Sequence, residues 1–138
     1  MQKILMLVDD EQLILRATIR HLQRAFPVAA NNYALLAFDD AASALMSARA
    51  NPQSVYFVIT DGHMPGMDGI DFVRLLMQDL GGQVRFCYLC TSDEEFANEA
   101  TAAFDASSIR AQAVHGKLVT AKEWPDILER IRSFLSES

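Results

Sequence analysis

The chain alternates between short apolar runs and longer stretches with helical spacing. Lys3–Val8 is an apolar run of strand length, and from Glu11 to Phe26 apolar residues recur at the intervals typical of one buried helix face. This succession repeats to the end of the chain. The predicted strands are Lys3–Val8, Tyr33–Phe38, Ser54–Thr60, Val84–Cys90 and Ala111–Lys117, and the predicted helices cover about residues 11–26, 40–50, 68–80, 93–105 and 120–135.

Five strand–helix pairs predict an α/β fold built on a doubly wound parallel sheet. Parallel strands need crossover connections, which helices supply. Strands that are apolar throughout indicate helices on both faces of the sheet. A length of 138 residues fits one domain. We therefore expect a single domain over residues 1–138, with no effector domain in this chain.

The ends of two helices carry local signals. Asp68 is an expected N-cap, and Gly81-Gly82 is expected to end the same helix. For the last helix, Thr120 and Glu123 form a capping-box pattern. Pro125 would then lie in the first turn, so a start at Trp124 or Pro125 is the alternative. The residues expected to face the core from this helix are Trp124, Leu128, Ile131 and Leu135.

The net charge of the chain restricts the classes of partner that it is expected to bind. Lys and Arg total 12 against 18 Asp and Glu, which gives a formal net charge of -6. Such a surface repels phosphate backbones and anionic lipids, so we expect no direct nucleic-acid binding and no membrane association. No apolar run approaches the ~20 residues of a transmembrane helix, and Ile4–Val8 is too short for a signal-peptide core. We expect a cytoplasmic protein.

The two cysteines form a C-x-x-C pattern inside a predicted strand. Residues three apart on a strand point to opposite faces, too far apart for a disulfide. Cys87 and Cys90 are therefore expected to be buried core thiols in a reducing compartment.

Polar side chains gather where four of the predicted strands end. The carboxyl ends of parallel strands meet at one edge of the sheet, where ligand sites form. The residues that follow or end strands one, three, four and five are Asp9, Asp10, Glu11, Asp61, Thr91, Ser92 and Lys117. After the second strand, Asp39 and Asp40 have the position of helix-capping residues.

These residue types suit phosphoryl transfer. Crowded carboxylates repel one another unless a cation is present, and hard oxygen ligands suit Mg²⁺. A carboxylate beside such an ion can attack phosphorus and form an aspartyl phosphate. The cation, a lysine and a hydroxyl group stabilise the charge that spreads over the transferring group.

The motifs at this edge resemble, in order, those of the receiver domain of two-component response regulators. They are Val8-Asp9-Asp10-Glu11, then Asp61-Gly62-His63-Met64-Pro65-Gly66-Met67-Asp68-Gly69, then Thr91-Ser92, and finally Lys117. The D-x-x-M-P-x-M-D-G run is the most diagnostic. The resemblance extends from Lys3 to about Leu135 and implies a flavodoxin-like fold with strand order 2-1-3-4-5.

The resemblance also implies roles for these residues. Asp61 would accept a phosphoryl group from the phosphohistidine of a sensor histidine kinase or histidine phosphotransfer protein. Mg²⁺ or Mn²⁺ would be held by Asp9, Asp10, Asp61 and the backbone carbonyl of His63, while Thr91 and Lys117 would contact the phosphoryl oxygens. The chain would then be a switch for an output domain or effector protein, and not an enzyme beyond slow self-dephosphorylation. A homodimer is one assembly that the resemblance allows.

Three features depart from the family pattern. Leu118 replaces the proline that usually follows the lysine through a cis bond, and Val114 replaces an aromatic switch residue. Thr91 and Lys117 are 26 positions apart, longer than is common, which points to an unusual segment around residues 106–110. All three lie toward the face that receivers use for output. They motivate an alternative: a degenerate receiver that binds partners without phosphoryl transfer.

Smaller questions concern single residues. His63, two positions after Asp61, is a candidate modulator of the lifetime of the phosphoryl group. Lys122 competes with Lys117 for the lysine role, and we favour Lys117 because it ends the fifth strand. A phosphatase of the haloacid-dehalogenase type is disfavoured, since those enzymes show D-x-D after the first strand.

Overall fold

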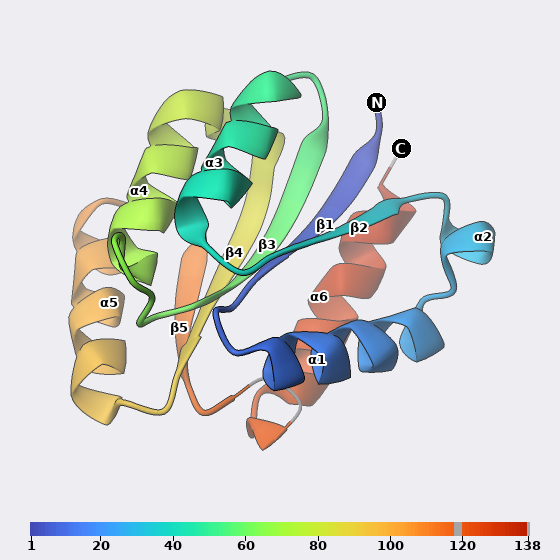
Figure 1. Ribbon diagram of the computed structural model, residues 1–138. Helices are drawn as coiled ribbons and strands as arrows, with labels where there is room; N and C mark the ends of the chain where they lie inside the picture. Colours follow the sequence, from blue (N-terminus) through green and yellow to red (C-terminus); the bar gives the residue numbers. More distant parts are fainter. Residues whose placement is uncertain (118–119, 138) are drawn as a thin grey trace.

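The computed structural model describes residues 1–117 and 120–137. Its centre is a five-stranded, all-parallel sheet of order β2-β1-β3-β4-β5 (Figure 1). The strands are β1 (Lys3–Val8), β2 (Ala34–Phe38), β3 (Val55–Asp61), β4 (Val84–Thr91) and β5 (Ala111–His115). The α-helices are α1 (Gln12–Ala25), α2 (Val28–Asn31), α3 (Ala41–Ala50), α4 (Gly69–Leu80), α5 (Glu94–Ala106) and α6 (Trp124–Ser136), and a 3-10 turn, η1, covers Gly81–Gln83.

Helices cover both faces of the sheet, as the sequence predicts. On one face, α1 and α6 enclose a core that contains Leu22, Phe57 and Ile131. On the other face, α3, α4 and α5 enclose a second core that contains Leu45, Phe72 and Phe104. Because both faces are covered, every residue of β3 is buried. The predicted fold class and strand order are confirmed.

The two cysteines of β4 belong to different cores. Cys87 packs with the α3–α5 side and Cys90 with the α1–α6 side, and both are buried. Burial raises the pKa of the Cys87 thiol to about 12, although Arg110 nearby opposes this shift. The prediction of core thiols on opposite faces is confirmed.

Two predictions at the element level are wrong. The short helix α2 interrupts the connection between α1 and β2, where no helix was expected. β5 ends at His115, two residues before Lys117, because the chain turns at Gly116. Gly116 has a φ of 136°, a conformation that favours glycine, and its N–H donates to the carbonyl of Thr91. The turn takes Lys117 off the strand ladder.

The predicted capping box of α6 is also wrong. Thr120 Oγ1 donates a hydrogen bond to the carbonyl of Lys117 and does not cap the helix. The helix begins at Trp124 with Pro125 in its first turn, which is the alternative start. Its fully buried residues are Ile127, Ile131 and Phe134, whereas the predicted Trp124, Leu128 and Leu135 pack partly buried against the same core.

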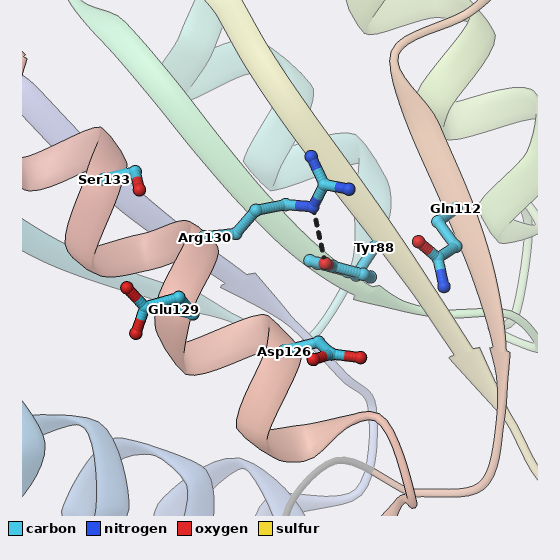
Figure 2. A pocket seen from close by; sticks show the side chains of 6 residues that line it. All are labelled: Tyr88, Gln112, Asp126, Glu129, Arg130 and Ser133. Carbon is cyan, nitrogen blue, oxygen red and sulfur yellow. Dashed lines mark hydrogen bonds between the residues drawn. The ribbon is translucent and has the colours of Figure 1, made fainter.

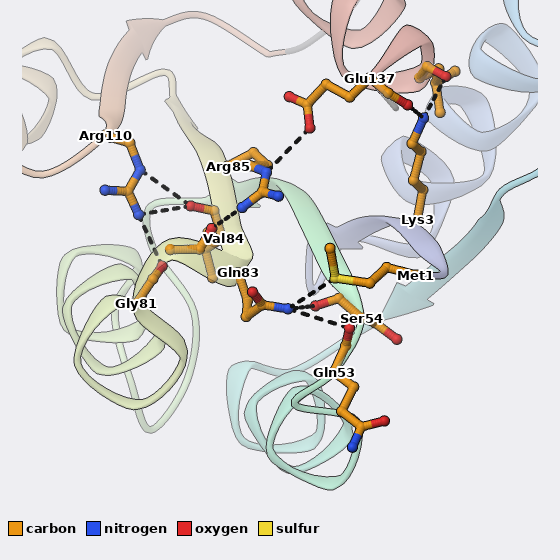
Figure 3. Close-up of polar contacts among 12 residues, drawn as sticks. Met1, Lys3, Gln53, Ser54, Gly81, Gln83, Val84, Arg85, Arg110 and Glu137 are labelled. Atoms are coloured by element: carbon orange, nitrogen blue, oxygen red, sulfur yellow. Dashed lines mark hydrogen bonds and ion pairs between the residues drawn. The ribbon is translucent and has the colours of Figure 1, made fainter.

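At the end of the sheet where the strands begin, cationic side chains donate hydrogen bonds to backbone carbonyls (Figure 3). Lys3 Nζ donates to the carbonyls of Leu135, at 2.8 Å, and Glu137. Arg110 Nη2 donates to the carbonyls of Gly81 and Val84. The carbonyls of Leu135, Glu137 and Gly81 lie at the C-terminal ends of α6 and α4, where carbonyls lack helical partners, and Val84 is the first residue of β4. This end of the molecule is therefore stabilised by structural contacts, opposite the polar edge.

Among the residues that the structure describes, no helix has both the length and the hydropathy to cross a bilayer.

Candidate phosphoacceptor site

Asp61 is the last residue of β3, and only 5% of its surface is exposed. Two donors hold its Oδ1 atom: the backbone N–H of Gly62 and Nζ of Lys117, each at 2.8 Å. Both hydrogen bonds end on the same oxygen. Within the described part of the chain, Oδ2 therefore accepts no hydrogen bond and is the carboxylate oxygen available for chemistry.

Asp9 lies beside this carboxylate at the end of β1. It is 3% exposed, and its Oδ1 accepts a hydrogen bond from the N–H of Glu11 at 2.9 Å, which fixes the turn into α1. Lys117 Nζ lies 3.8 Å from Asp9 Oδ2 and 3.7 Å from Glu11 Oε1. One ammonium group thus contacts three carboxylates, two from the turn between β1 and α1 and one from the end of β3.

Burial and the neighbouring charges shift the pKa values of Asp9 and Lys117. Desolvation raises the pKa of Asp9 to about 6, and the charge of Asp61 adds to the rise, while the Glu11 N–H and Lys117 oppose it. Desolvation alone would lower the pKa of Lys117. Its hydrogen bond to Asp61 and the charges of Asp9, Asp61 and Glu11 outweigh that effect and raise the pKa. The lysine is therefore charged at neutral pH.

The carboxylates fit a divalent cation. One oxygen each from Asp9, Glu11 and Asp61 lies within 4.8 Å of the others. Burial raises the pKa of Asp9, so its ionised form is favoured when a cation lies beside it. Carboxylate oxygens are also hard donors, which Mg²⁺ prefers. The donor set and its electrostatics are therefore consistent with the predicted metal.

The structure groups the acids after β1 differently from the sequence prediction. Asp10 is exposed and lies outside the group of three, whereas Glu11 belongs to it. Asp9 and Asp10, and not Glu11, were predicted as ligands because the resemblance to receiver domains assigns that role to these two acids. The ligand roles of Asp10 and of the His63 carbonyl stay predictions.

Thr91 ends β4, which pairs with β3. It is 2% exposed, and its Oγ1 accepts a hydrogen bond from the N–H of Asp93 at 3.1 Å. The adjoining Cys90 pairs in register with Asp61, and its carbonyl accepts the N–H of Gly62. The structure thus places the predicted hydroxyl on the strand beside Asp61.

His63 turns its ring toward α5. Its Nε2 lies 3.0 Å from Asp93 Oδ2, and its ring centroid lies 4.2 Å from that of Phe96. Asp93 also caps α5 by accepting from the N–H of Phe96, and this bond, followed by the His63 contact, lowers the pKa of Asp93. A role for His63 in phosphoryl lifetime stays a prediction.

The choice between the two lysines follows from these contacts, since Lys117 reaches Asp61 and Lys122 is exposed.

Val114, at the position of the missing aromatic residue, is 1% exposed and packs in the core beneath α6. Leu118, where the family has proline, lies outside the described residues.

A separate surface hollow of about 300 Å³ lies between β4, β5 and α6 (Figure 2). Arg130 Nε donates to the hydroxyl of Tyr88 at 2.8 Å there, and the guanidinium stacks over the ring of Phe86. None of the residues that line this hollow belongs to the group formed by Asp9, Glu11, Asp61 and Lys117.

Comparisons with known proteins agree with this geometry. The sequence model of the response regulator receiver domain matches residues 5–110. ARR21 of Arabidopsis thaliana, whose name describes a two-component response regulator, is 32% identical over 76 residues, which is 55% of this chain and 11% of that protein. The chain therefore spans about a tenth of that relative.

Solved structures share the fold. Chemotaxis protein CheY4 of Vibrio cholerae is 20% identical, with a TM-score of 0.67 over 97% of this chain and 99% of that one. A response regulator receiver protein of Dyadobacter fermentans is 14% identical, with a TM-score of 0.71 over 98% of this chain and 99% of that one. With its motifs, its strand order and the match over residues 5–110, this chain belongs to the response regulator receiver domain family.

Proposed function

We propose that this receiver domain accepts a phosphoryl group on Asp61 from a phosphohistidine of a sensor histidine kinase or histidine phosphotransfer protein. The observation that carries the proposal is the Asp61 carboxylate itself. Its Oδ1 is held by Lys117 and the Gly62 N–H, while Oδ2 accepts no hydrogen bond in the described part of the chain. An oriented carboxylate with one available oxygen is a suitable nucleophile.

The transfer forms one bond and breaks another. An Asp61 oxygen attacks the phosphorus of the donor, the P–N bond to the imidazole breaks, and the imidazole keeps the electron pair and takes up a proton. The product is an acyl phosphate on Asp61. The Lys117 ammonium, already beside Asp61, would neutralise phosphoryl oxygens, and the buried Thr91 hydroxyl would donate to one of them.

The metal that the family implies would be held by Asp9 and Asp61, with Asp10, Glu11 and the His63 carbonyl as further candidates. Bound Mg²⁺ would supply positive charge that offsets the repulsion between the carboxylates and the incoming phosphoryl group. Asp9 contributes a buried carboxylate, and Glu11 keeps the turn after β1 fixed through its N–H.

We further propose that the domain acts as a switch for an output domain or effector protein and turns over no substrate beyond its own dephosphorylation. The chemistry in the site ends with a covalent phosphoryl group, and only water is needed to remove it. We also propose that this reaction takes place in the cytoplasm.

Intact mass spectrometry tests the proposal. The chain is incubated with Mg²⁺ and acetyl phosphate, a donor that needs no protein partner. We expect the wild type to gain one phosphoryl group and Asp61→Asn to gain none, and chelation of the metal should prevent the gain. Asp39→Asn, an acid after β2 outside the group, is the matched control. A wild type that stays unmodified would favour the degenerate receiver.

A further inference from the structure

Two exposed helices of this domain carry opposite charge. The sequence of α1 (Gln12–Ala25) contains Arg16, Arg20 and Arg24 and no acidic residue. The sequence of α5 (Glu94–Ala106) contains Glu94, Glu95, Glu99 and Asp105 and no basic residue, and Asp93 caps it. α1 therefore carries a positive charge, although the net charge of the whole chain is -6.

These charges face solvent. The three arginines of α1 lie at intervals of four residues, and all three are exposed, as are Glu95 and Glu99 of α5. Within the described residues, none of these five side chains takes part in an ion pair. Unpaired charges at helical spacing form a stripe that a complementary helix can meet.

The two helices cannot pair within one molecule. α1 packs with α6 on one face of the sheet, and α5 packs with α3 and α4 on the other (Figure 1). A contact between an α1 stripe and an α5 stripe must therefore join two copies. Because the two surfaces differ, the contact is head-to-tail, and each copy keeps one stripe available for the next.

The spacing of the residues supports one register. If the helices pair in antiparallel directions with Arg20 opposite Glu95, then Arg16 stands opposite Glu99, since both pairs are separated by four residues. The same register places Leu13 opposite the small, exposed Ala102. Leu13 is 79% exposed, unusual for a leucine, and would lose contact with water in this arrangement.

We propose that the domain associates with further copies of itself through α1 of one copy and α5 of the next. This inference does not depend on phosphoryl transfer. Exposed ion pairs are individually weak, so the association is expected only at high protein concentration and low ionic strength. The net charges of two copies repel each other, but the opposite charges of the paired stripes lie closest together, where Coulomb attraction is strongest.

Sedimentation velocity of the full chain over a range of concentrations tests the proposal. We expect the mean sedimentation coefficient to rise with concentration at low salt without a plateau at dimer, and to fall to the monomer value in roughly 1 M salt, where the screening length is about 3 Å. Monomer at every concentration at low salt would overturn the proposal.

Charge reversal identifies the surfaces. Arg16→Glu/Arg20→Glu and Glu95→Arg/Glu99→Arg should each weaken self-association at least tenfold when measured alone. An equimolar mixture of the two variants should associate again, because each then offers the other a complementary helix. Arg74→Glu/Lys122→Glu, with the same change of net charge as the α1 variant, should still associate. Far-UV circular dichroism checks that every variant is folded.

Two results would assign the stripes differently and overturn the proposal. Association that both reversal variants retain would place the interface elsewhere. A wild type that stays monomeric but binds a poly-glutamate peptide, with binding lost in Arg16→Glu/Arg20→Glu, would assign α1 to an acidic partner of another kind.

Discussion

At the scale of single residues, Gly69 shows how closely α4 approaches the end of β3. A Cβ at this position would lie 2.5 Å from the backbone oxygen of Asp61 and 2.9 Å from the side chain of Leu89. The first is a backbone atom, and the second is the methyl group of a fully buried leucine, so neither can move away into solvent. The glycine in the diagnostic motif is therefore required by its contact with the backbone of Asp61 at the end of β3.

We expect Gly69→Ala to lower the free energy of unfolding by about 1–3 kcal/mol, because the backbone of Asp61 must move. Phosphorylation by acetyl phosphate should slow in the same variant. Urea denaturation measures the first effect and intact mass the second. Gly82→Ala is the control, since a Cβ at Gly82 meets nothing within 4 Å. Equal losses of stability in the two variants would contradict this account.

Asp9 predicts a dependence of stability on pH in the metal-free protein. Burial raises its pKa from 3.8 to about 6, so between these values the folded state binds more protons than the unfolded state. Stability contributed by this group is therefore present at low pH and is lost as the pH rises through about 6. Asp9→Asn carries no charge at any pH, so its stability does not fall in this way as the pH rises.

In chelator, we expect Asp9→Asn to be more stable than the wild type at pH 7 by on the order of 1–3 kcal/mol. The difference should shrink as the pH falls toward 4. Urea denaturation across this range measures it, with the exposed-acid variant Asp39→Asn as the control. A difference that stays constant between pH 4 and pH 7 would show that the Asp9 carboxylate does not titrate as its burial requires.

At the scale of elements, local sequence fixes helix starts where an aspartate can cap. Asp40, Asp68 and Asp93 each accept a hydrogen bond from a backbone N–H in the first turn of α3, α4 and α5. α6 has no such cap, and the sequence prediction failed there, because Thr120 instead bonds to the carbonyl of Lys117. Only the folded loop reveals that competing acceptor.

We expect Asp68→Ala to destabilise the domain by about 1 kcal/mol, because the N–H of Asp71 loses its acceptor. Urea denaturation checks the value. Asp105→Ala, an exposed aspartate that caps no helix start, should change stability by less than about 0.5 kcal/mol. If the two variants lose the same amount, the cap contributes no more than the removal of a surface charge.

The strand predictions were accurate for the three central strands, which are covered on both faces and consist mostly of apolar residues. β1 has the bounds that the sequence predicts, and β3 and β4 differ by one residue at most at each end. β5 was predicted too long because Gly116 and Lys117 continue the pattern in sequence but leave the sheet in space. An edge strand has only one neighbour to hold its last residues, so its end depends on the turn.

At the scale of the whole molecule, the site joins strands that are far apart in sequence, so bound metal should stabilise the entire fold. With Mg²⁺ at a hundred times its Kd, we expect the free energy of unfolding to rise by about 2.7 kcal/mol. Asp9→Asn and Asp61→Asn should lose this gain, and Asp39→Asn should keep it. Thermal unfolding with and without Mg²⁺ measures the effect.

The same titration separates the two acids that follow Asp9. The predicted ligand role of Asp10 requires Asp10→Asn to lose a large part of the Mg²⁺ stabilisation. The grouping of Glu11 with Asp9 and Asp61 requires the same of Glu11→Gln. Full stabilisation in both variants would remove both acids from the metal site.

Apart from α2, the order of strands and helices along the chain, the burial of the core and the position of Asp61 at a strand end follow from the sequence. They depend on hydrophobic periodicity and on short motifs, which act between near neighbours. Tertiary structure decided that Glu11, and not Asp10, joins Asp9, Asp61 and Lys117, and that α1 and α5 carry opposite charge on opposite faces. Consecutive side chains diverge where a strand turns into a helix, so only the folded chain determines which of them meet.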